Sequence, residues 1–315
     1  MPDSTDDPIR PSDLETLLAT PGFGDSAISP DIDTIAARLP SLAEVVGVTV
    51  AGPVIMNAVG VHGSPTPLGG PLAIGAEQIS LRLNPSRLSS ALQTDPAALV
   101  PPTLRLFDSS GNTAHATYLT ENSDRLAFES LSLSTSVAAV HGSDPAPVPP
   151  LPGPEYIQAA LHDRHDGDQV GLFDSILLDG GTSRLRLLAQ GHGSRGIRVD
   201  PSRVITSLEH AALLGMTVTV AAAAPGCMQM RQDRLDGARE HRGQMVLASG
   251  TSRVMVNFNH VEQCWVTRSP GVWGPTAAIE FYDRRSRCCL VVTHTGPVPR
   301  ATAEAWDHLT CDLTS

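Results

Sequence analysis

Alternating polar and apolar residues predict a β-hairpin over residues 103–119, which read TLRLFDSSGNTAHATYL. Leu104 and Leu106 share one face of its first strand, with Arg105 and Phe107 on the other, because successive side chains on a strand point to opposite sides. The following cluster, DSSGN, is typical of a turn, since its glycine can take the positive φ that tight connections often need. A second alternating run completes the hairpin.

Helix signals flank this strand-rich region in the first half of the chain. Ser12 and Glu15 have the spacing of a capping box, which predicts a first helix. A second helical stretch is expected from Asp31, divided by Pro40 and ended by Gly47. The remaining expected elements are strands over 48–51, 54–60 and 77–84, and a helix starting at Ser123-Asp124.

The second half repeats this order of elements. Asp200-Pro201 is an N-cap followed by proline at the first helical position, so a helix is expected to about Leu214, with Gly215 as its stop. Met216 to Ala222 reads as a strand, more strands follow to about residue 294, and Thr302 is expected to cap a last helix. Helix, antiparallel strands and helix in each half predict an α+β fold with helices packed on large sheets.

Four pairs of matching segments indicate an internal duplication, because they keep their order at nearly constant offsets of 170 to 178 residues. They are Val48–Val50 with Val218–Val220, Leu81–Leu83 with Val256–Phe258, Phe107-Asp108 with Tyr282-Asp283, and Phe128/Leu131 with Trp306/Leu309. We therefore predict two tandem structural repeats. The domains are an N-terminal tail and helix (1–29), a first repeat (30–133), a linker with an inter-repeat helical segment (134–198), and a second repeat (199–315). The linker holds six prolines within 144–154, as a stiff spacer does.

Composition narrows the class of protein. The chain has 315 residues and a formal net charge of −11, which disfavours nucleic acid as a partner. All 22 basic residues are arginine, which fits a GC-rich genome or a preference for carboxylate and phosphate groups. No apolar run reaches the length of a transmembrane helix, and the N-terminus lacks a signal-peptide pattern. We expect a cytoplasmic protein whose five cysteines are reduced thiols, since their number is odd and no C-x-x-C occurs.

Two motifs that suggest chemistry have simpler interpretations. Residues 191–196 match G-x-G-x-x-G, but a helical run precedes them and no helix follows, so we interpret them as a loop. His162 and His165, with Asp163, Asp166 and Asp168 nearby, could bind a metal on a helix. Because no third ligand has diagnostic spacing, a solvated charged cluster is favoured over a non-haem metal site. A metal-dependent hydrolase through these histidines is the weakest hypothesis, and no G-x-S-x-G elbow occurs.

The chain resembles the cytoplasmic bacterial hemin-transport and hemin-degrading factors of the HemS/ChuS/HmuS type. The matching segments are ARLPSLAEV (37–45), ISLRLNPSRL (79–88), the stretch 103–131, VDPSRVITSLEHAALLGMTVTV (199–220), GCMQM (226–230), VEQCWVTRSP (261–270), AIEFYD and AEAWDHL. The resemblance implies two similar halves, each with a large antiparallel sheet and flanking helices. It also implies binding of haem as ligand or substrate, hand-over to other proteins, and reductant-dependent opening of the macrocycle. Implied partners are a haem ABC transporter and an electron donor, for a monomer or homodimer.

In this family the iron ligand is a histidine in a T-D-x-H-x-F-F motif between the repeats, and an arginine from the first half faces the other side of the haem. Asp168 and Phe173 match that motif here, but Val170 stands at the histidine position. The resemblance therefore leaves His165, or less favourably His162, as iron ligand, with Asp166 or Asp168 accepting from the ring.

Arg82 matches the family's arginine, and the alternative for this residue is an ordinary surface arginine. The alternative function is a divergent member without axial ligation, acting as a binding or scaffold module for another planar apolar molecule.

Overall fold

The computed structural model describes residues 11–21, 27–29, 31–72, 74, 78–96, 100–133, 169–191, 196–271 and 274–315. The first half contains α1 (Asp13–Ala19), β1 (Ala27–Ser29), α2 (Ile32–Arg38), the 3-10 helix η1 (Leu39–Leu42), β2 (Ala43–Ala51), β3 (Val54–His62), β4 (Thr66–Pro67), β5 (Gln78–Leu83), η2 (Pro85–Arg87), β6 (Leu88–Thr94), β7 (Thr103–Asp108), β8 (Thr113–Ser123) and α3 (Arg125–Leu133).

Two helices, α5 (Gln169–Asp179) and α6 (Thr182–Ala189), precede the second half. That half contains β9 (Gly196–Val199), α7 (Pro201–Leu213), β10 (Thr217–Ala224), β11 (Cys227–Arg234), β12 (Gly237–His241), β13 (Gln244–Ser249), β14 (Ser252–Asn257), η4 (Phe258–His260), β15 (Val261–Gly271), β16 (Gly274–Asp283), β17 (Cys288–Thr293) and α8 (Arg300–Thr314). Every helix within these described ranges is too short or too polar to span a bilayer.

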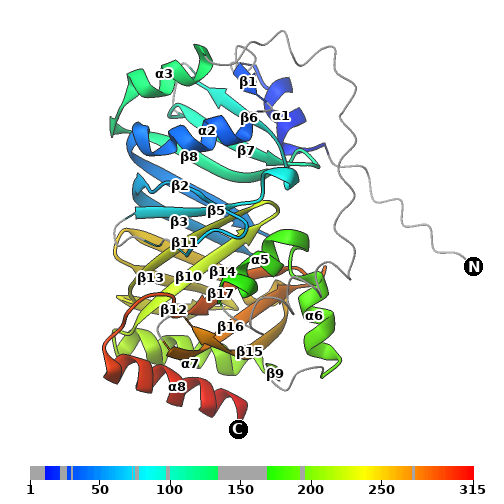
Figure 1. The fold of residues 1–315 in the computed structure, drawn as a ribbon, viewed down its shortest axis with the longest axis vertical. Helices are drawn as coiled ribbons and strands as arrows, with labels where there is room; N and C mark the ends of the chain where they lie inside the picture. Colours follow the sequence, from blue (N-terminus) through cyan, green and yellow to red (C-terminus); the bar gives the residue numbers. More distant parts are fainter. Residues whose placement is uncertain are drawn as a thin grey trace, which may run out of the picture.

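The strands form two large sheets, and each sheet takes strands from both halves. One runs β1-β6-β7-β8-β2-β3-β14-β13-β12, all antiparallel. The other runs β9-β15-β16-β17-β10-β11-β5-β4, antiparallel except for β4 beside β5. A short parallel pairing of β3 with β5 joins the two sheets. Figure 1 shows α2 and α3 toward one end of the long axis and α7 and α8 at the other, with the strands between them.

The pairings confirm the α+β fold with two tandem repeats. Strand β11 of the second half pairs with β5 of the first, and β14 pairs with β3 in the corresponding exchange. The same bulge follows Leu88 opposite Asp108 and Val261 opposite Asp283. Both aspartates also accept backbone hydrogen bonds from the second and fourth residues after them, which closes the same turn twice. Phe107 and Tyr282 precede these aspartates and occupy corresponding positions.

Strand register corrects two of the matched segments. Val46 of β2 pairs with Tyr118, and Thr219 of β10 pairs with Thr293, the residue that corresponds to Tyr118. Val46 therefore corresponds to Thr219, which is three residues from the position that the match through Val48–Val50 gives. Leu83 pairs with β11 in the same way that Val256 pairs with β3, so Leu83 corresponds to Val256. The match through Leu81–Leu83 had aligned Val256 with Leu81, two residues away. A strand pattern that repeats every two residues fits several registers, which accounts for the two-residue difference at Leu81–Leu83. The three-residue difference at Val48–Val50 is odd, so that match also assigned the side chains to the wrong faces.

Helix ends follow local sequence in most cases. The predicted capping box of Ser12 and Glu15 is present, and Asp200 caps α7 as expected. Asp31, where a helix was expected to begin, is the N-cap of α2. Gly47 was wrongly predicted to end a helix, because it lies within β2. An added Cβ at Gly47 would come within 3.1 Å of the Ile79 side chain and 3.3 Å of the His115 ring, so this position in the sheet is tightly packed. Thr302 was wrongly predicted as a cap, because α8 already begins at Arg300 after Pro299.

The two faces of the second-half sheet bury different clusters. Trp306 and Leu309 of α8 and Val204 and Leu208 of α7 belong to the main core, which also continues through the first half. A second cluster fills the space between the opposite face of the sheet and helices α5 and α6. Cys288 belongs to this second cluster and Cys289 to the main core, which confirms that these neighbours point to opposite faces.

Candidate functional site

Helix α5 lies on the face of β10, β11 and β15–β17 that is opposite α7 and α8, with α6 beside it (Figure 1). Leu172, Phe173, Ile176 and Leu177 of α5 are at most 4% exposed and pack on this face. Helix α6 begins after the tight turn at Gly180 and Gly181, both with positive φ. The carboxylate of Asp179 accepts hydrogen bonds from two backbone amides in that turn. Helices α5 and α6 are therefore the described part of the predicted inter-repeat segment; its residues 134–168 lie outside the described residues.

Residues of the first half hold α5 from its other side. The Nε of Arg82 donates to Oδ1 of Asp174 at 2.7 Å, and Arg82 is fully buried. Asn84 donates to the carbonyl of Leu177 at 3.2 Å, and Arg87 donates to that of Leu178 at 2.7 Å. These two contacts satisfy carbonyl groups at the end of α5 that have no partner within the helix. The first repeat therefore fixes the position of α5 on the sheet of the second.

The guanidinium of Arg82 has further partners. It donates to the backbone carbonyls of Gly70 at 3.0 Å and Pro71 at 3.3 Å. The second oxygen of Asp174 accepts from the amide of Gly69 at 3.0 Å. The alternative of an ordinary surface arginine is thus wrong for Arg82. Its charge is neutralised inside the protein, where pairing offsets the cost of removing it from water.

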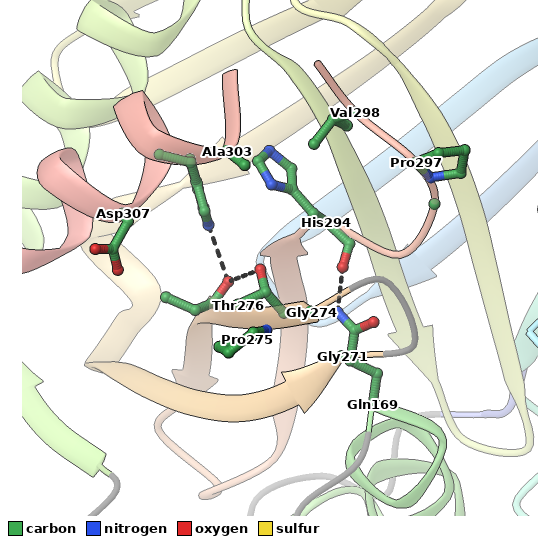
Figure 2. A pocket seen from close by; sticks show the side chains of 13 residues that line it. Gln169, Gly271, Gly274, Pro275, Thr276, His294, Pro297, Val298, Ala303 and Asp307 are labelled. Atoms are coloured by element: carbon green, nitrogen blue, oxygen red, sulfur yellow. Dashed lines mark hydrogen bonds between the residues drawn. The ribbon is translucent and has the colours of Figure 1, made fainter. Parts of the chain in front are cut away.

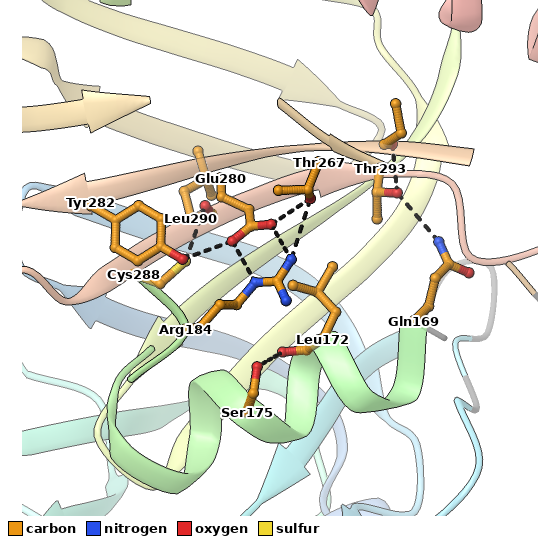
Figure 3. A network of polar contacts seen from close by, with 11 residues as sticks. Gln169, Leu172, Ser175, Arg184, Thr267, Glu280, Tyr282, Cys288, Leu290 and Thr293 are labelled. Carbon is orange, nitrogen blue, oxygen red and sulfur yellow. Dashed lines mark hydrogen bonds and ion pairs between the residues drawn. The ribbon is translucent and has the colours of Figure 1, made fainter. Parts of the chain in front are cut away.

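A second buried ion pair joins α6 to the sheet (Figure 3). Arg184 donates through Nε and Nη2 to the two oxygens of Glu280, at 2.8 and 2.6 Å. Glu280 is fully buried and also accepts from Thr267 at 2.5 Å and from the hydroxyl of Tyr282 at 2.7 Å. This bidentate geometry gives strong, directional hydrogen bonds.

Electrostatics keep this network ionised. Burial acts to raise the pKa of Glu280, but the charge of Arg184 and three side-chain hydrogen bonds act more strongly together and lower it. Burial and the charge of Glu280 raise the pKa of Tyr282 well above its ordinary value. Burial, with Glu280, also raises the pKa of the adjacent Cys288. Tyr282 and Cys288 are therefore neutral at pH 7.

The sequence-predicted site residues fall in different places. Val170 is half-buried in the first turn of α5, one turn before Asp174 and so on the same face of the helix. Phe173 is fully buried in the second cluster. Arg82 is hydrogen-bonded to Asp174, the residue that follows Phe173. His162 and His165, together with Asp166 and Asp168, lie outside the described residues. The sequence did not single out Asp174, Arg184 or Glu280, because their partners are far away in the chain.

Other candidate chemistry is limited. Within the described ranges no three histidine, cysteine, aspartate or glutamate side chains gather as a metal site would require. All five cysteines are free, four of them buried. Gly191 follows α6, Gly196 begins β9, and 192–195 lie outside the described residues. Helix before strand is the reverse of a dinucleotide-binding unit, so the loop interpretation of this motif is supported.

Comparison with protein families and with solved structures identifies proteins that this chain resembles. Residues 181–313 match the family model described as the haemin-degrading HemS.ChuX domain. The crystal structure of ChuS, an E. coli heme oxygenase, superposes with a TM-score of 0.72 at 18% identity, over 92% of this chain and 89% of that one. Apo-PhuS, a heme-binding protein from Pseudomonas aeruginosa, superposes with a TM-score of 0.70 at 16% identity, over 92% and 87%. These likenesses show the fold. A search of curated proteins finds no significant match.

Proposed function

Residues 181–313 of this chain belong to the haemin-degrading HemS/ChuX domain family, as the sequence predicted, and from this premise we propose that the protein binds haem. The family match carries the proposal. The fold shared with ChuS and PhuS supports it, because it extends over both repeats. Within the proposal, the protein works in the cytosol in haem-iron utilisation, receives haem from a transporter, and opens the macrocycle oxidatively, with O2 as oxidant and with electrons that a reductant or protein electron donor supplies.

The described residues fit haem only in part. A haem site needs an iron ligand, apolar walls and cations for two propionates. Helix α5 and its sheet supply apolar residues, but Val170 supplies no ligand. Arg82 and Arg184 are already neutralised by Asp174 and Glu280. Within the described part of α5 and its contacts, these residues position the helix, and we derive no chemical step from them.

We therefore assign axial ligation to His165, or less favourably His162, on the segment that leads into α5. Asp166 or Asp168 would accept the second ring N–H and so fix the imidazole. Arg82 would act through Asp174, by holding the face of α5 that carries position 170. This differs from direct contact with haem, which would require Arg82 to leave three hydrogen-bond acceptors in the protein.

The test is a haem titration of the purified apoprotein, followed by the Soret band. His165→Ala and His162→Ala, singly and together, should shift the Soret maximum and weaken binding by at least about tenfold if the assignment is correct. His308→Ala on the exposed side of α8 is a matched control, and His192→Ala is a second. An unchanged spectrum in the double variant would refute the assignment. Loss of the Soret band when ascorbate is added would support degradation.

The second candidate is a member without axial ligation that binds another planar apolar molecule. Two observations favour it: valine at position 170 and the neutralised guanidinium of Arg82. Val170→His distinguishes the candidates. If the wild type binds no haem and Val170→His gives a histidine-type haem spectrum, the pocket has kept its shape and lost its ligand, and the second candidate replaces the first.

A further inference from the structure

One face of the first-half sheet carries a row of exposed apolar side chains. This sheet contains β2, β3, β14 and β13, and Val50, Ile55, Met255 and Val246 lie directly opposite one another across these four strands. Each of them is between 37% and 44% exposed. Because directly paired residues share a face, all four point to the same side of the sheet, which we call the open face. The other side of the same strands belongs to the main core.

The duplication relates the open face to the face that α5 covers in the second half. Ile55 pairs with Val50 and Met255 in the same way that Met228 pairs with Ala223 and Arg82. The three residues of the second set are at most 8% exposed, because α5 lies on them. Within the described residues no helix covers the first set. The first half therefore exposes a surface that the second half buries.

Helix α5 shows which contacts hold a helix on such a face. Its first residue, Gln169, donates to the backbone carbonyl of His294 (Figure 2). Four of its apolar side chains pack on the sheet, and its Asp174 carboxylate pairs with Arg82 of β5. A helix is thus held here by apolar contacts together with an ion pair between a carboxylate of the helix and an arginine of the sheet.

The open face also offers arginines to a partner. Arg239 of β12 lies directly opposite Val246, and Arg253 lies two residues before Met255 on β14, so both side chains belong to the open face. Both are exposed, and neither forms an ion pair within the described part of the chain. Glu44, at the far end of β2, is the only acid on the open face of β2, β3, β12, β13 and β14. The open face is therefore locally basic on a chain whose net charge is −11.

The size of the apolar row fits one helix better than a second copy of the chain. The row crosses four strands and so spans about 14 Å, at about 4.8 Å for each strand spacing. A helix as long as α5, which has 11 residues, is about 16 Å long. A stable dimer buries about 800 Å² on each partner, which is more than a few partly exposed side chains offer. Two copies that each carry a net charge of −11 also repel each other.

We propose that the open face binds an amphipathic helix of another protein, whose apolar side covers Ile55 and Met255 and whose acidic side chains pair with Arg239 and Arg253. Arginine forks suit carboxylates, and the apolar row beside them excludes water from part of the contact. The contact repeats in the first half the way in which α5 lies on the second. It uses the first-half sheet and does not depend on the haem proposal.

The test uses the full-length protein and two fluorescein-labelled model helices of about 15 residues. One is an amphipathic helix of leucine, alanine and glutamate, and its twin has lysine in place of glutamate. In fluorescence anisotropy the acidic helix should bind saturably, and the basic twin at least about tenfold more weakly. In protein labelled with ¹³C-methyl methionine, the acidic helix should shift the Met255 resonance and leave that of Met56 in place, because Met56 is fully buried on the core side of β3.

Variants at exposed positions separate the apolar contribution from the charge contribution. Ile55→Glu should weaken binding of the acidic helix at least about tenfold, because it places a carboxylate in the middle of the apolar contact. Arg239→Glu/Arg253→Glu should weaken the acidic helix and strengthen the basic twin. Leu213→Glu, at an 85% exposed position of α7, is the matched control and should change neither affinity.

Three results would overturn the proposal. The first is equal affinity for the acidic and basic helices, and the second is wild-type affinity in Ile55→Glu. The third is a dimer, measured by light scattering, that Ile55→Glu converts to a monomer, because the open face would then join two copies of the chain. Circular dichroism checks that each variant is folded, and Arg239→Glu/Arg253→Glu keeps the test decisive if Ile55→Glu folds poorly.

Discussion

Arg82 of β5 and Asp174 of α5 form a buried ion pair across 92 residues of sequence, with 2.7 Å between Nε and Oδ1. The pair joins a strand from the first repeat to the helix that precedes the second. Because β5 is itself hydrogen-bonded to β11, the contact fixes α5 against a sheet built from both repeats. Helix α5, which carries Val170, is therefore held in place by contacts with strands of both repeats.

Removing one member of this pair should destabilise the protein strongly. Arg82→Ala leaves the Asp174 carboxylate buried without its cation, and such losses typically cost about 3–5 kcal/mol. Urea denaturation at pH 7 measures the change. The double variant Arg82→Met/Asp174→Leu should recover much of the loss, because it buries no charge. A single variant within about 0.5 kcal/mol of wild type would show that the pair does not hold α5.

Glu280 should be as sensitive as Arg82. Glu280→Gln keeps the shape but removes the charge that neutralises Arg184, so we expect a loss of about 3 kcal/mol in the free energy of unfolding. The control is Glu304→Gln, which breaks an exposed pair with Arg300 and should change stability by less than about 0.5 kcal/mol. Equal effects of the two variants in urea denaturation would contradict the structural importance of the Glu280 network.

Local sequence predicted the elements better than their packing. The hairpin of β7 and β8 was expected from alternation and its turn residues, and Gly111 takes φ +75° as predicted. Gly47 was misinterpreted because the constraint on it is tertiary: a Cβ there would crowd the side chains of Ile79 in β5 and His115 in β8. Thr302 was misinterpreted because α8 already begins at Arg300, with Pro299 as its N-cap residue.

The candidate site could be predicted only where the family motif reached. Val170 and Phe173 were located by spacing within that motif, and both lie on α5. Glu280 and Arg184 are 96 residues apart, and no local pattern links an arginine on a helix to a glutamate on a strand. His294 likewise had no sequence signal, because the Trp306 ring that packs beside it comes from another element.

The cysteines should react in two classes. Cys227, Cys264, Cys288 and Cys289 are buried, and burial raises the pKa of each thiol, whereas Cys311 is exposed. Because the thiolate is the reactive form, a native protein prepared under reducing conditions should show one rapidly reacting thiol with Ellman's reagent. Five should react after denaturation. Cys311→Ser should abolish the rapid phase, and three or fewer thiols after denaturation would indicate disulfides.

The last prediction concerns acid and a pair of histidines in the first repeat. His62 and His115 are each 1% exposed, and their rings meet at 5.4 Å. Burial lowers the pKa of His62 to about 4, and burial and then the charge of His62 lower the pKa of His115 well below its ordinary value.

Since both histidines protonate more readily in the unfolded chain, near pH 6.5, the unfolded state binds more protons between pH 6.5 and 4. Stability is therefore full above about pH 6.5 and falls as the pH is lowered toward 4, with His62 alone contributing about 3 kcal/mol. The second repeat has Leu235 and Leu290 at the corresponding positions, so His62→Leu/His115→Leu should fold. Urea denaturation between pH 7.5 and 4.5 should give a shallower slope for the double variant, with a remainder from His294, whose pKa is also lowered to about 4. Identical slopes for wild type and double variant would show that these histidines do not set the acid sensitivity.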